Sequence, residues 1–200
     1  MRTPHCSTLF NVVLVLFFLC AATGLAADAP PDQPPGEKSE VVVMPNSMSE
    51  IKAETLPAMT LVALSMSGSY EQHGAAIGKL MMYTGMSGFQ MTGGPFGIYL
   101  NSPEEVAEDS LLWQVCVPVA GVTAVEKPYE LIEMPEMLAA YGICTGPIET
   151  TDPCYGVLFE WIAKNSYETA GPLQEHWLTD DRTTPPEENK TKIVIPVVKK

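Results

Sequence analysis

Apolar stretches of similar length and order occur twice between residues 57 and 198. Each copy opens with an extended apolar segment, 57–66 (PAMTLVALSM) in the first copy and 135–144 (PEMLAAYGIC) in the second. Each copy ends with two shorter stretches typical of strands, and together these cover 96–100, 112–119, 173–178 and 191–198. The pattern predicts three strands in each copy.

A helix is predicted after the first strand of each copy, because apolar residues there recur at spacings of three and four. The positions are Ile77, Leu80, Met81 and Thr84, then Cys154, Val157, Leu158, Trp161 and Ile162. Asp152 and Pro153 predict an N-cap and a preformed first turn for the second helix, and Gly85 and Gly88 predict the end of the first. Both copies therefore follow a β-α-β-β order, which predicts an α+β fold with helices on one face of an antiparallel sheet.

The two copies also share residues at a fixed offset. Shifting the sequence by 78 residues without gaps gives ten identities over a 63-residue window, among them Gly68 on Gly146 and Leu80 on Leu158. The identities fall at turns, helix faces and strand ends. A duplicated module is the interpretation we adopt, and the period is too long for a solenoid.

The first 27 residues have the three-part layout of a secretory signal peptide. Arg2 and the free amine precede an apolar stretch of 12 residues at 9–20, which is followed by the small residues AATGLAA. The apolar stretch is shorter than the roughly 20 residues that a spanning helix needs. We expect cleavage after Ala26 or Ala27 and export to the periplasm or the cell exterior, with no stable membrane insertion afterwards.

Residues 28–49 contain five prolines and predict an extended tether. The folded domain is then expected at 50–200, with copy one at about 50–121 and copy two at about 128–199.

The excess of acidic over basic residues indicates which classes of partner the protein can bind. The chain has 11 Lys and Arg against 24 Asp and Glu, a net charge of −13. Nucleic-acid binding by phosphate neutralisation needs clustered basic residues, so we expect no nucleic-acid partner. A hydrophobic content of 46% is enough to form a buried core.

Three cysteines, Cys116, Cys144 and Cys154, remain after removal of the predicted signal peptide. An odd number allows at most one internal disulfide. We place Cys144 at a strand end and Cys154 on the apolar face of a helix, and we expect all three thiols to be free and mostly buried. The sequence lacks C-x-x-C, C-x-x-C-H and H-E-x-x-H spacings, so we expect no metal site.

Several motifs together resemble the GyrI-like, or AraC-type, effector-binding domain family, whose fold the SOUL haem-binding proteins share. The motifs are SGSYEQHG, GGPFGIYLNSPEEV and WQVCVPV in copy one, and PYELIEMPEM, TGPIETT, GPLQEHWL and IVIPV in copy two. The resemblance covers 50–198. It implies two βαββ modules whose strands form a curved antiparallel sheet, with a pocket for an amphipathic small molecule where the modules meet.

Family members that regulate transcription carry a DNA-binding domain before this one. Here a predicted signal peptide and tether precede the domain, so we expect an exported, stand-alone ligand-binding domain rather than a regulator.

The resemblance also implies a ligand-binding glutamate, Glu175, two residues before Trp177. Strand alternation places both on one face, with Tyr99 at the matching position of copy one. A carboxylate beside aromatic rings can form a binding site for a cationic or aromatic ligand. Tyr70 fits the family turn G-x-Y-E and is expected at the pocket rim.

Other polar and aromatic residues are assigned structural roles. We expect His73 at the surface, His176 on the strand face opposite Glu175, and Trp113 in packing or at an interface. Ile148 replaces the tyrosine that the family turn would have in copy two, which makes that side of the pocket more apolar.

Two alternatives to simple binding stay open. The first is a small-molecule hydrolase with Glu175 as general base and Tyr70 or Tyr99 as proton donor. The second is haem binding of the SOUL type. The chain has no G-x-S-x-G motif and no P-loop, so we expect neither an enzyme nor a cofactor. The ligand and the oligomeric state are left open by the sequence.

Overall fold

The computed structural model describes residues 46–200, and the predicted signal peptide and most of the predicted tether lie outside them. Copy one contains β3 (Met59–Ser67), α1 (His73–Met86), β5 (Phe96–Tyr99) and β6 (Leu112–Ala120). Copy two contains β8 (Met137–Thr145), α2 (Asp152–Lys164), β10 (Leu173–Trp177) and β11 (Lys190–Lys199). The predicted α+β fold with two β-α-β-β modules is confirmed.

The 78-residue offset holds in detail. Met59–Ser67 becomes Met137–Thr145, and the short 3₁₀ turn Tyr70–Gln72 before α1 becomes Ile148–Thr150 before α2. The short strands β4 (Gln90–Met91) and β9 (Tyr167–Thr169) follow the two helices at matching places. The duplication therefore extends to turns that the apolar pattern does not reveal.

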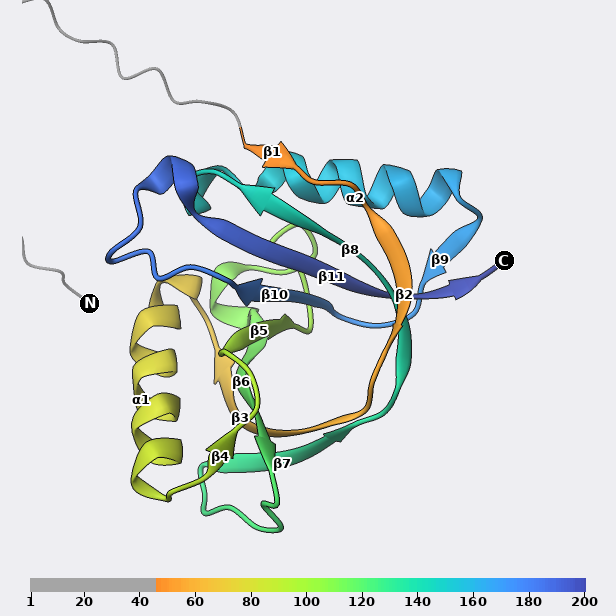
Figure 1. Cartoon of the computed structure of the whole chain (residues 1–200). Coiled ribbons are helices and arrows are strands. Elements are labelled where there is room, and N and C mark those ends of the chain that lie inside the picture. The colour runs from red at the N-terminus through yellow and green to blue at the C-terminus, as the bar shows by residue number, and fades with distance from the viewer. Residues whose placement is uncertain (1–45) are drawn as a thin grey trace, which may run out of the picture. The chain divides into compact units, whose positions relative to one another are not determined.

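All strands belong to one 11-stranded antiparallel sheet whose main path runs β1-β8-β11-β10-β5-β6-β3-β7. The modules meet at β10 and β5, where Glu175 pairs with Gly97. Glu175 also pairs with Ile193 in β11, and Gly97 pairs with Val115 in β6. Because Val115 belongs to the cluster under α1 and Ile193 to the cluster under α2, both helices cover the same face of the sheet (Figure 1).

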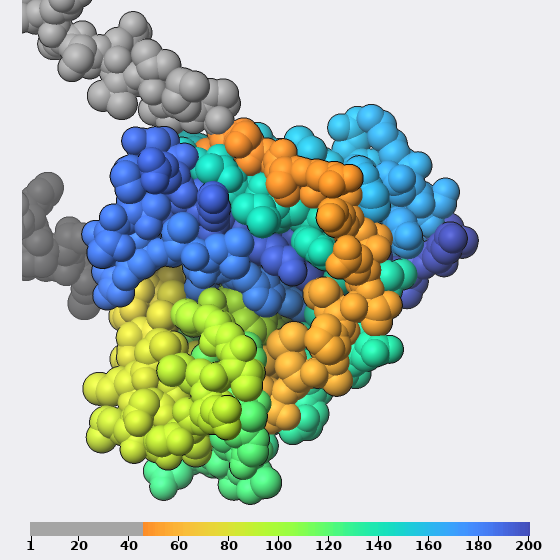
Figure 2. All heavy atoms as spheres, viewed as in Figure 1, coloured from red at the N-terminus to blue at the C-terminus, as the bar shows by residue number. Residues whose placement is uncertain are grey.

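The modules exchange one strand each. β2 (Lys52–Leu56) precedes β3 in copy one but pairs with β8 of copy two, while β7 (Tyr129–Met134) precedes β8 in copy two but pairs with β3 of copy one. β1 (Ser47–Met48) adds to the end of β8. In the space-filling view, this N-terminal stretch lies on the surface beside β8 (Figure 2). The apolar pattern did not predict these strands.

Each helix packs on the sheet through three equivalent residues. These are Ala76, Leu80 and Thr84 in α1, and Cys154, Leu158 and Ile162 in α2. Thr84 is fully buried, and its hydroxyl donates to the carbonyl of Leu80 at 3.0 Å. A third cluster lies on the other face of the sheet and contains Leu61, Ala63, Phe96, Ile98 and Cys116. The core therefore occupies both faces.

The helix boundaries differ in part from the prediction. The N-cap of α2 is Thr151, and Asp152 is already the first helical residue. Gly85 lies inside α1, whereas Gly88, at a φ of 68°, follows the helix end in the left-handed region that favours glycine. Pro153 lies in the first turn of α2 as predicted.

Two of the three predicted free cysteines form a disulfide. Cys144 at the end of β8 is bonded to Cys154 in the first turn of α2, with their Cα atoms 6.0 Å apart. The expectation was wrong because the short connection between β8 and α2 brings the strand end and the helix face within the roughly 7 Å that a disulfide needs. Cys116 is free and buried, and burial raises the pKa of its thiol to about 12.

Neither helix among residues 46–200 has the length and apolar character needed to cross a membrane.

Candidate functional site

Glu175 lies at the centre of the sheet, on the face that carries both helices. Its side chain is only 8% exposed. Gly97, directly across from it, is the equivalent residue of copy one, so the two modules contribute a glutamate and a glycine to the same place. The carboxylate therefore occupies one side of the junction between the modules and faces a position without a side chain.

Two tyrosine hydroxyls donate to the Glu175 carboxylate. Tyr99 in β5 donates to Oε2 at 2.8 Å, and Tyr155 in the first turns of α2 donates to Oε1. Burial, followed by the negative charge of Glu175, raises the pKa of both tyrosines far above the usual range. Both hydroxyls thus remain protonated donors at physiological pH.

Aromatic rings surround this carboxylate from the side of α1. The Tyr70 and Tyr99 rings meet edge to face at 5.1 Å, and Tyr70 stacks on the His73 ring at 5.3 Å. His73 also lies 4.3 Å from the Trp113 ring and 5.8 Å from the Trp177 ring, measured between centroids. We call these five residues, Tyr70, His73, Tyr99, Trp113 and Trp177, the aromatic cluster.

Gly97 makes room for two rings of the aromatic cluster. A Cβ atom placed on Gly97 would lie 3.1 Å from the Tyr99 hydroxyl oxygen and 3.2 Å from Cη2 of Trp177. Ordinary contacts at a Cβ are longer than this. The missing side chain thus allows the Tyr99 ring to fold back along its own strand, so that its hydroxyl reaches Glu175.

The histidine of the cluster is held neutral. His73 is half-buried, and burial lowers its pKa to about 4. Its Nε2 lies 3.4 Å from the Tyr99 hydroxyl oxygen. The expectation that His73 lies at the surface was wrong, because the strands at the module junction bring rings from distant parts of the chain around the start of α1.

The family model of the GyrI-like small molecule binding domain matches residues 49–198. The chain belongs to the GyrI-like family. No curated protein matches the chain. The family assignment makes this a small-molecule-binding domain, as the resemblance of the motifs predicted.

Several solved structures share the fold. The EcmrR C-terminal domain has a TM-score of 0.68 and 18% identity, with 76% of this chain and 98% of that one covered. In the EcmrR–DNA complex, with the same TM-score and identity, the match covers 76% of this chain but only 58% of the EcmrR chain. A hydrolase from Listeria innocua has a TM-score of 0.54 and 15% identity, with 74% and 92% covered.

The GyrI-like fold brings the four predicted site residues together. Three of them are rings of the aromatic cluster beside the fourth, the Glu175 carboxylate: Tyr70, Tyr99 and Trp177. Their role in ligand binding stays a prediction. The hydroxyl of Tyr70 donates to the carbonyl of Asn101 at 3.4 Å. His176 lies on the opposite strand face, stacked on Phe96 at 4.2 Å, as expected.

Tyr155 was not among the predicted site residues. Tyr155 precedes Leu158 by three residues and Ile162 by seven, so the helical spacing that identified the buried face of α2 also places Tyr155 near it. Its equivalent in copy one is Ile77. Trp113, assigned to packing or an interface, is completely buried, and its Nε1 donates to the carbonyl of Gly68 at 2.9 Å.

Two hollows of the described surface lie away from Glu175. One of about 390 Å³ is lined by residues of the last turn of α2 and by β9, and another of about 340 Å³ lies at the equivalent end of copy one. Glu175 lines neither of them. With 8% of its surface exposed and tyrosine hydroxyls on both oxygens, Glu175 is largely covered by side chains in this structure.

Proposed function

We propose that this GyrI-like domain is exported and captures an amphipathic cation with aromatic character at Glu175. The observation that carries the proposal is a nearly buried carboxylate with no basic partner among residues 46–200. The ion pairs among residues 46–200 all involve other acidic residues: Glu50, Glu160, Glu168 and Asp180. Burial of a charge without a counter-charge is unfavourable, and a cationic ligand would supply that counter-charge.

The rings around Glu175 fit the same ligand class. Tyr and Trp faces attract cations, and they also provide apolar area for an aromatic ligand. Two rings of the aromatic cluster, Tyr70 and Trp177, are half-buried and so are partly exposed to solvent. The neutral His73 adds no competing positive charge. Charge and ring contacts thus favour a flat organic cation over a small inorganic ion.

Charge selectivity is tested with two probes of matched shape. The cation is N-methyl-para-phenylpyridinium, and its neutral counterpart is para-methylbiphenyl. Glu175→Gln keeps the shape and removes the charge, so affinity for the cation should fall by about 2 to 4 kcal/mol. Affinity for the neutral probe should stay within about twofold, and equilibrium dialysis measures both.

The stability of the same variant serves as the control. Loss of a buried charge and loss of one tyrosine hydrogen bond act in opposite directions, so the free energy of unfolding should change by less than about 1 kcal/mol. Equal binding of both probes by both proteins would contradict a cation-selective site. Neither probe has a hydrolysable bond, so the hydrolase alternative needs a separate substrate, and Glu175-dependent cleavage of an aryl ester would favour it. A Soret band after haem addition would favour haem binding.

Export is part of the proposal and rests on the pattern in residues 1–27. Protein recovered from its native host should begin near Ala27 or Asp28. N-terminal sequencing that finds an intact Met1 would contradict export, and it would leave the ligand site unaffected.

A further inference from the structure

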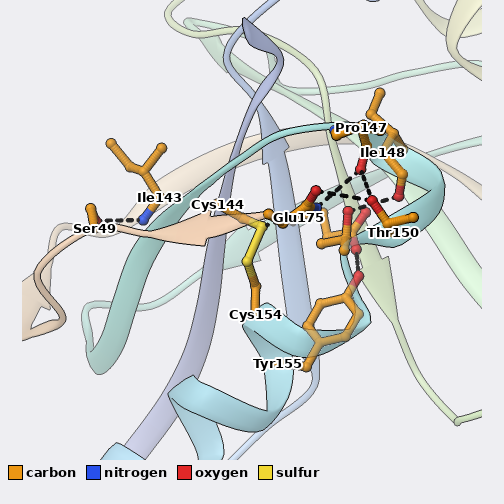
Figure 3. The surroundings of a disulfide bond; sticks show 11 residues. Ser49, Ile143, Cys144, Pro147, Ile148, Thr150, Cys154, Tyr155 and Glu175 are labelled. Atoms are coloured by element: carbon orange, nitrogen blue, oxygen red, sulfur yellow. Dashed lines mark hydrogen bonds between the residues drawn. A yellow bond between two sulfur atoms is a disulfide. The ribbon is translucent and has the colours of Figure 1, made fainter. Parts of the chain in front are cut away.

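The Cys144–Cys154 disulfide lies next to the ligand site. Cys154 directly precedes Tyr155, the residue of α2 whose hydroxyl donates to Glu175. Figure 3 shows the disulfide at the end of β8, with the Tyr155 ring extending from α2 to the Glu175 carboxylate. The covalent bond therefore fixes the backbone at the point from which Tyr155 covers the carboxylate.

The two tyrosines on Glu175 come from different elements, Tyr99 from the sheet and Tyr155 from the start of α2. Tyr99 is part of β5, at the centre of the sheet, where its ring lies over Gly97 and meets the Tyr70 ring edge to face. Tyr155 follows the connection 146–151, which is held by a few side-chain bonds. Asn46 Nδ2 donates to the carbonyl of Pro147 at 3.0 Å, and the Thr150 hydroxyl donates to Asn46 Oδ1 at 2.9 Å.

Only one module has this cross-link. The residues equivalent to Cys144 and Cys154 in copy one are Met66 and Ala76, and the residue equivalent to Tyr155 is Ile77. The described disulfide thus occurs in the module that places a tyrosine over Glu175. Its counterpart has neither the bond nor the hydroxyl.

We propose that the Cys144–Cys154 disulfide positions Tyr155 over Glu175 and makes access to the ligand site depend on its redox state. The inference rests on the proposed function of Glu175. With the disulfide formed, the connection between β8 and α2 has fewer open conformations, so opening carries a larger entropic cost. Reduction lowers that cost, and a ligand that needs the open state then binds more tightly.

The chemistry is a thiol–disulfide exchange with a dithiol as the reductant. A thiolate of the dithiol attacks one sulfur and releases the other cysteine as a thiolate; the second thiol of the reductant then displaces the first cysteine. Two electrons and two protons pass to Cys144 and Cys154, and the dithiol becomes a cyclic disulfide. Both cysteines are nearly buried, with exposures of 3% and 2%. The attack therefore follows local opening of the first turn of α2.

Binding of N-methyl-para-phenylpyridinium to the full chain, oxidised or treated with dithiothreitol, tests the inference. Reduction should tighten binding roughly three- to tenfold. The Cys144→Ala, Cys154→Ala double variant should bind like the reduced protein and should not respond to dithiothreitol. Cys116→Ala, which changes the free cysteine on the opposite face of the sheet, should keep the full response.

Tyr155→Ile separates a positioning role from a general structural one, because it introduces the residue that copy one has at this place. The response to reduction should shrink to less than about twofold in this variant, since no tyrosine is left for the disulfide to hold. A response of unchanged size in Tyr155→Ile would overturn the inference, as would equal binding by the oxidised and reduced wild type.

Hydrogen exchange provides a readout without ligand. Reduction should speed exchange of the amides at 148–156 and leave the amides of β5 and β6 unchanged. Unchanged exchange at 148–156 would overturn the inference. Absence of cation binding in both redox states would contradict the proposed function of Glu175, and the exchange result would then still decide whether the disulfide restrains Tyr155.

The coupling is also reciprocal. If reduction tightens binding tenfold, a saturating cation must favour reduction tenfold, which raises the reduction potential of the disulfide by about 30 mV. Redox titration against a dithiol buffer, with and without the probe, measures this shift. If reduction changes the affinity but the probe leaves the reduction potential unchanged, the two measurements do not report the same equilibrium. That result would count against the inference.

Discussion

At the scale of single residues, the site depends on different residues at equivalent positions of the two modules. Copy two supplies Glu175 and Trp177, while copy one supplies Gly97 and Tyr99 two residues apart. Strand alternation in the sequence is enough to place each pair on one face. It does not reveal that Tyr99 leans back over Gly97, since that depends on the space left by a missing side chain.

Gly97→Ala should therefore weaken cation binding. The new Cβ would lie 3.1 Å from the Tyr99 hydroxyl oxygen and 3.2 Å from the Trp177 ring, so one or both rings must shift. We expect a loss of affinity of roughly tenfold and a stability loss of about 1 to 3 kcal/mol, typical of overpacking. Equilibrium dialysis and urea unfolding measure the two effects.

Gly78→Ala is the matched control for this substitution. Gly78 is exposed in α1, and a Cβ there would meet nothing within 4 Å. This change should leave binding unaltered and raise stability by up to about 1 kcal/mol, because alanine has the higher helix propensity. Unaltered cation binding by Gly97→Ala would contradict the role assigned to Gly97.

At the scale of elements, the sequence predicted both helices and the six main strands within a few residues. It succeeded because each element has its own apolar period and because the duplication supplies every signal twice. β2 and β7 were missed for a physical reason. Each pairs with a strand of the other module rather than with the next strand along the chain, so neither its local period nor its neighbouring segments indicate its partner.

The two helices should be anchored equally by their equivalent leucines. Leu80 in α1 and Leu158 in α2 are both completely buried. Leu80→Ala and Leu158→Ala should each lower the free energy of unfolding by about 2 to 5 kcal/mol, as buried leucines do. Val157→Ala, at a position that is 47% exposed, should cost less than about 1 kcal/mol. Urea denaturation checks all three, and a small loss at Leu158 alone would show that α2 is held mainly by its disulfide.

At the scale of the whole molecule, the disulfide marks the limit of sequence interpretation. Cysteine count and spacing allowed one bond but not its identity, because proximity of Cys144 and Cys154 depends on how the β8–α2 connection folds. The neutral His73 has the same origin. Both properties arise from tertiary contacts between residues that no local pattern connects.

Stability should fall on mild acidification because two half-buried histidines are neutral in the folded protein. Burial, together with nearby Lys192, lowers the pKa of His176 to about 4, and burial lowers that of His73 to about 4. The unfolded chain binds these protons near pH 6.5, so stability present above that value is lost as the pH falls from about 6.5 to about 4. Each histidine should account for about 1 to 2 kcal/mol at pH 5.

The contribution of His176 can be isolated because it lies on the face opposite Glu175. His176→Asn should make the fall in the urea midpoint between pH 7 and pH 5 shallower. An identical pH dependence in wild type and variant would contradict a neutral, half-buried His176.

The exchange of β2 and β7 gives the two modules different histories during synthesis. When β7 is synthesised, its partner β3 has already been made, and the two are separated by the rest of copy one. Of the described strands, β1 alone is made before β2, yet the partner of β2, β8, begins only at Met137. Until β8 has been made, the segment KAETL has no partner strand. Its charged residues Lys52 and Glu54 disfavour wrong edge-to-edge pairing during that time.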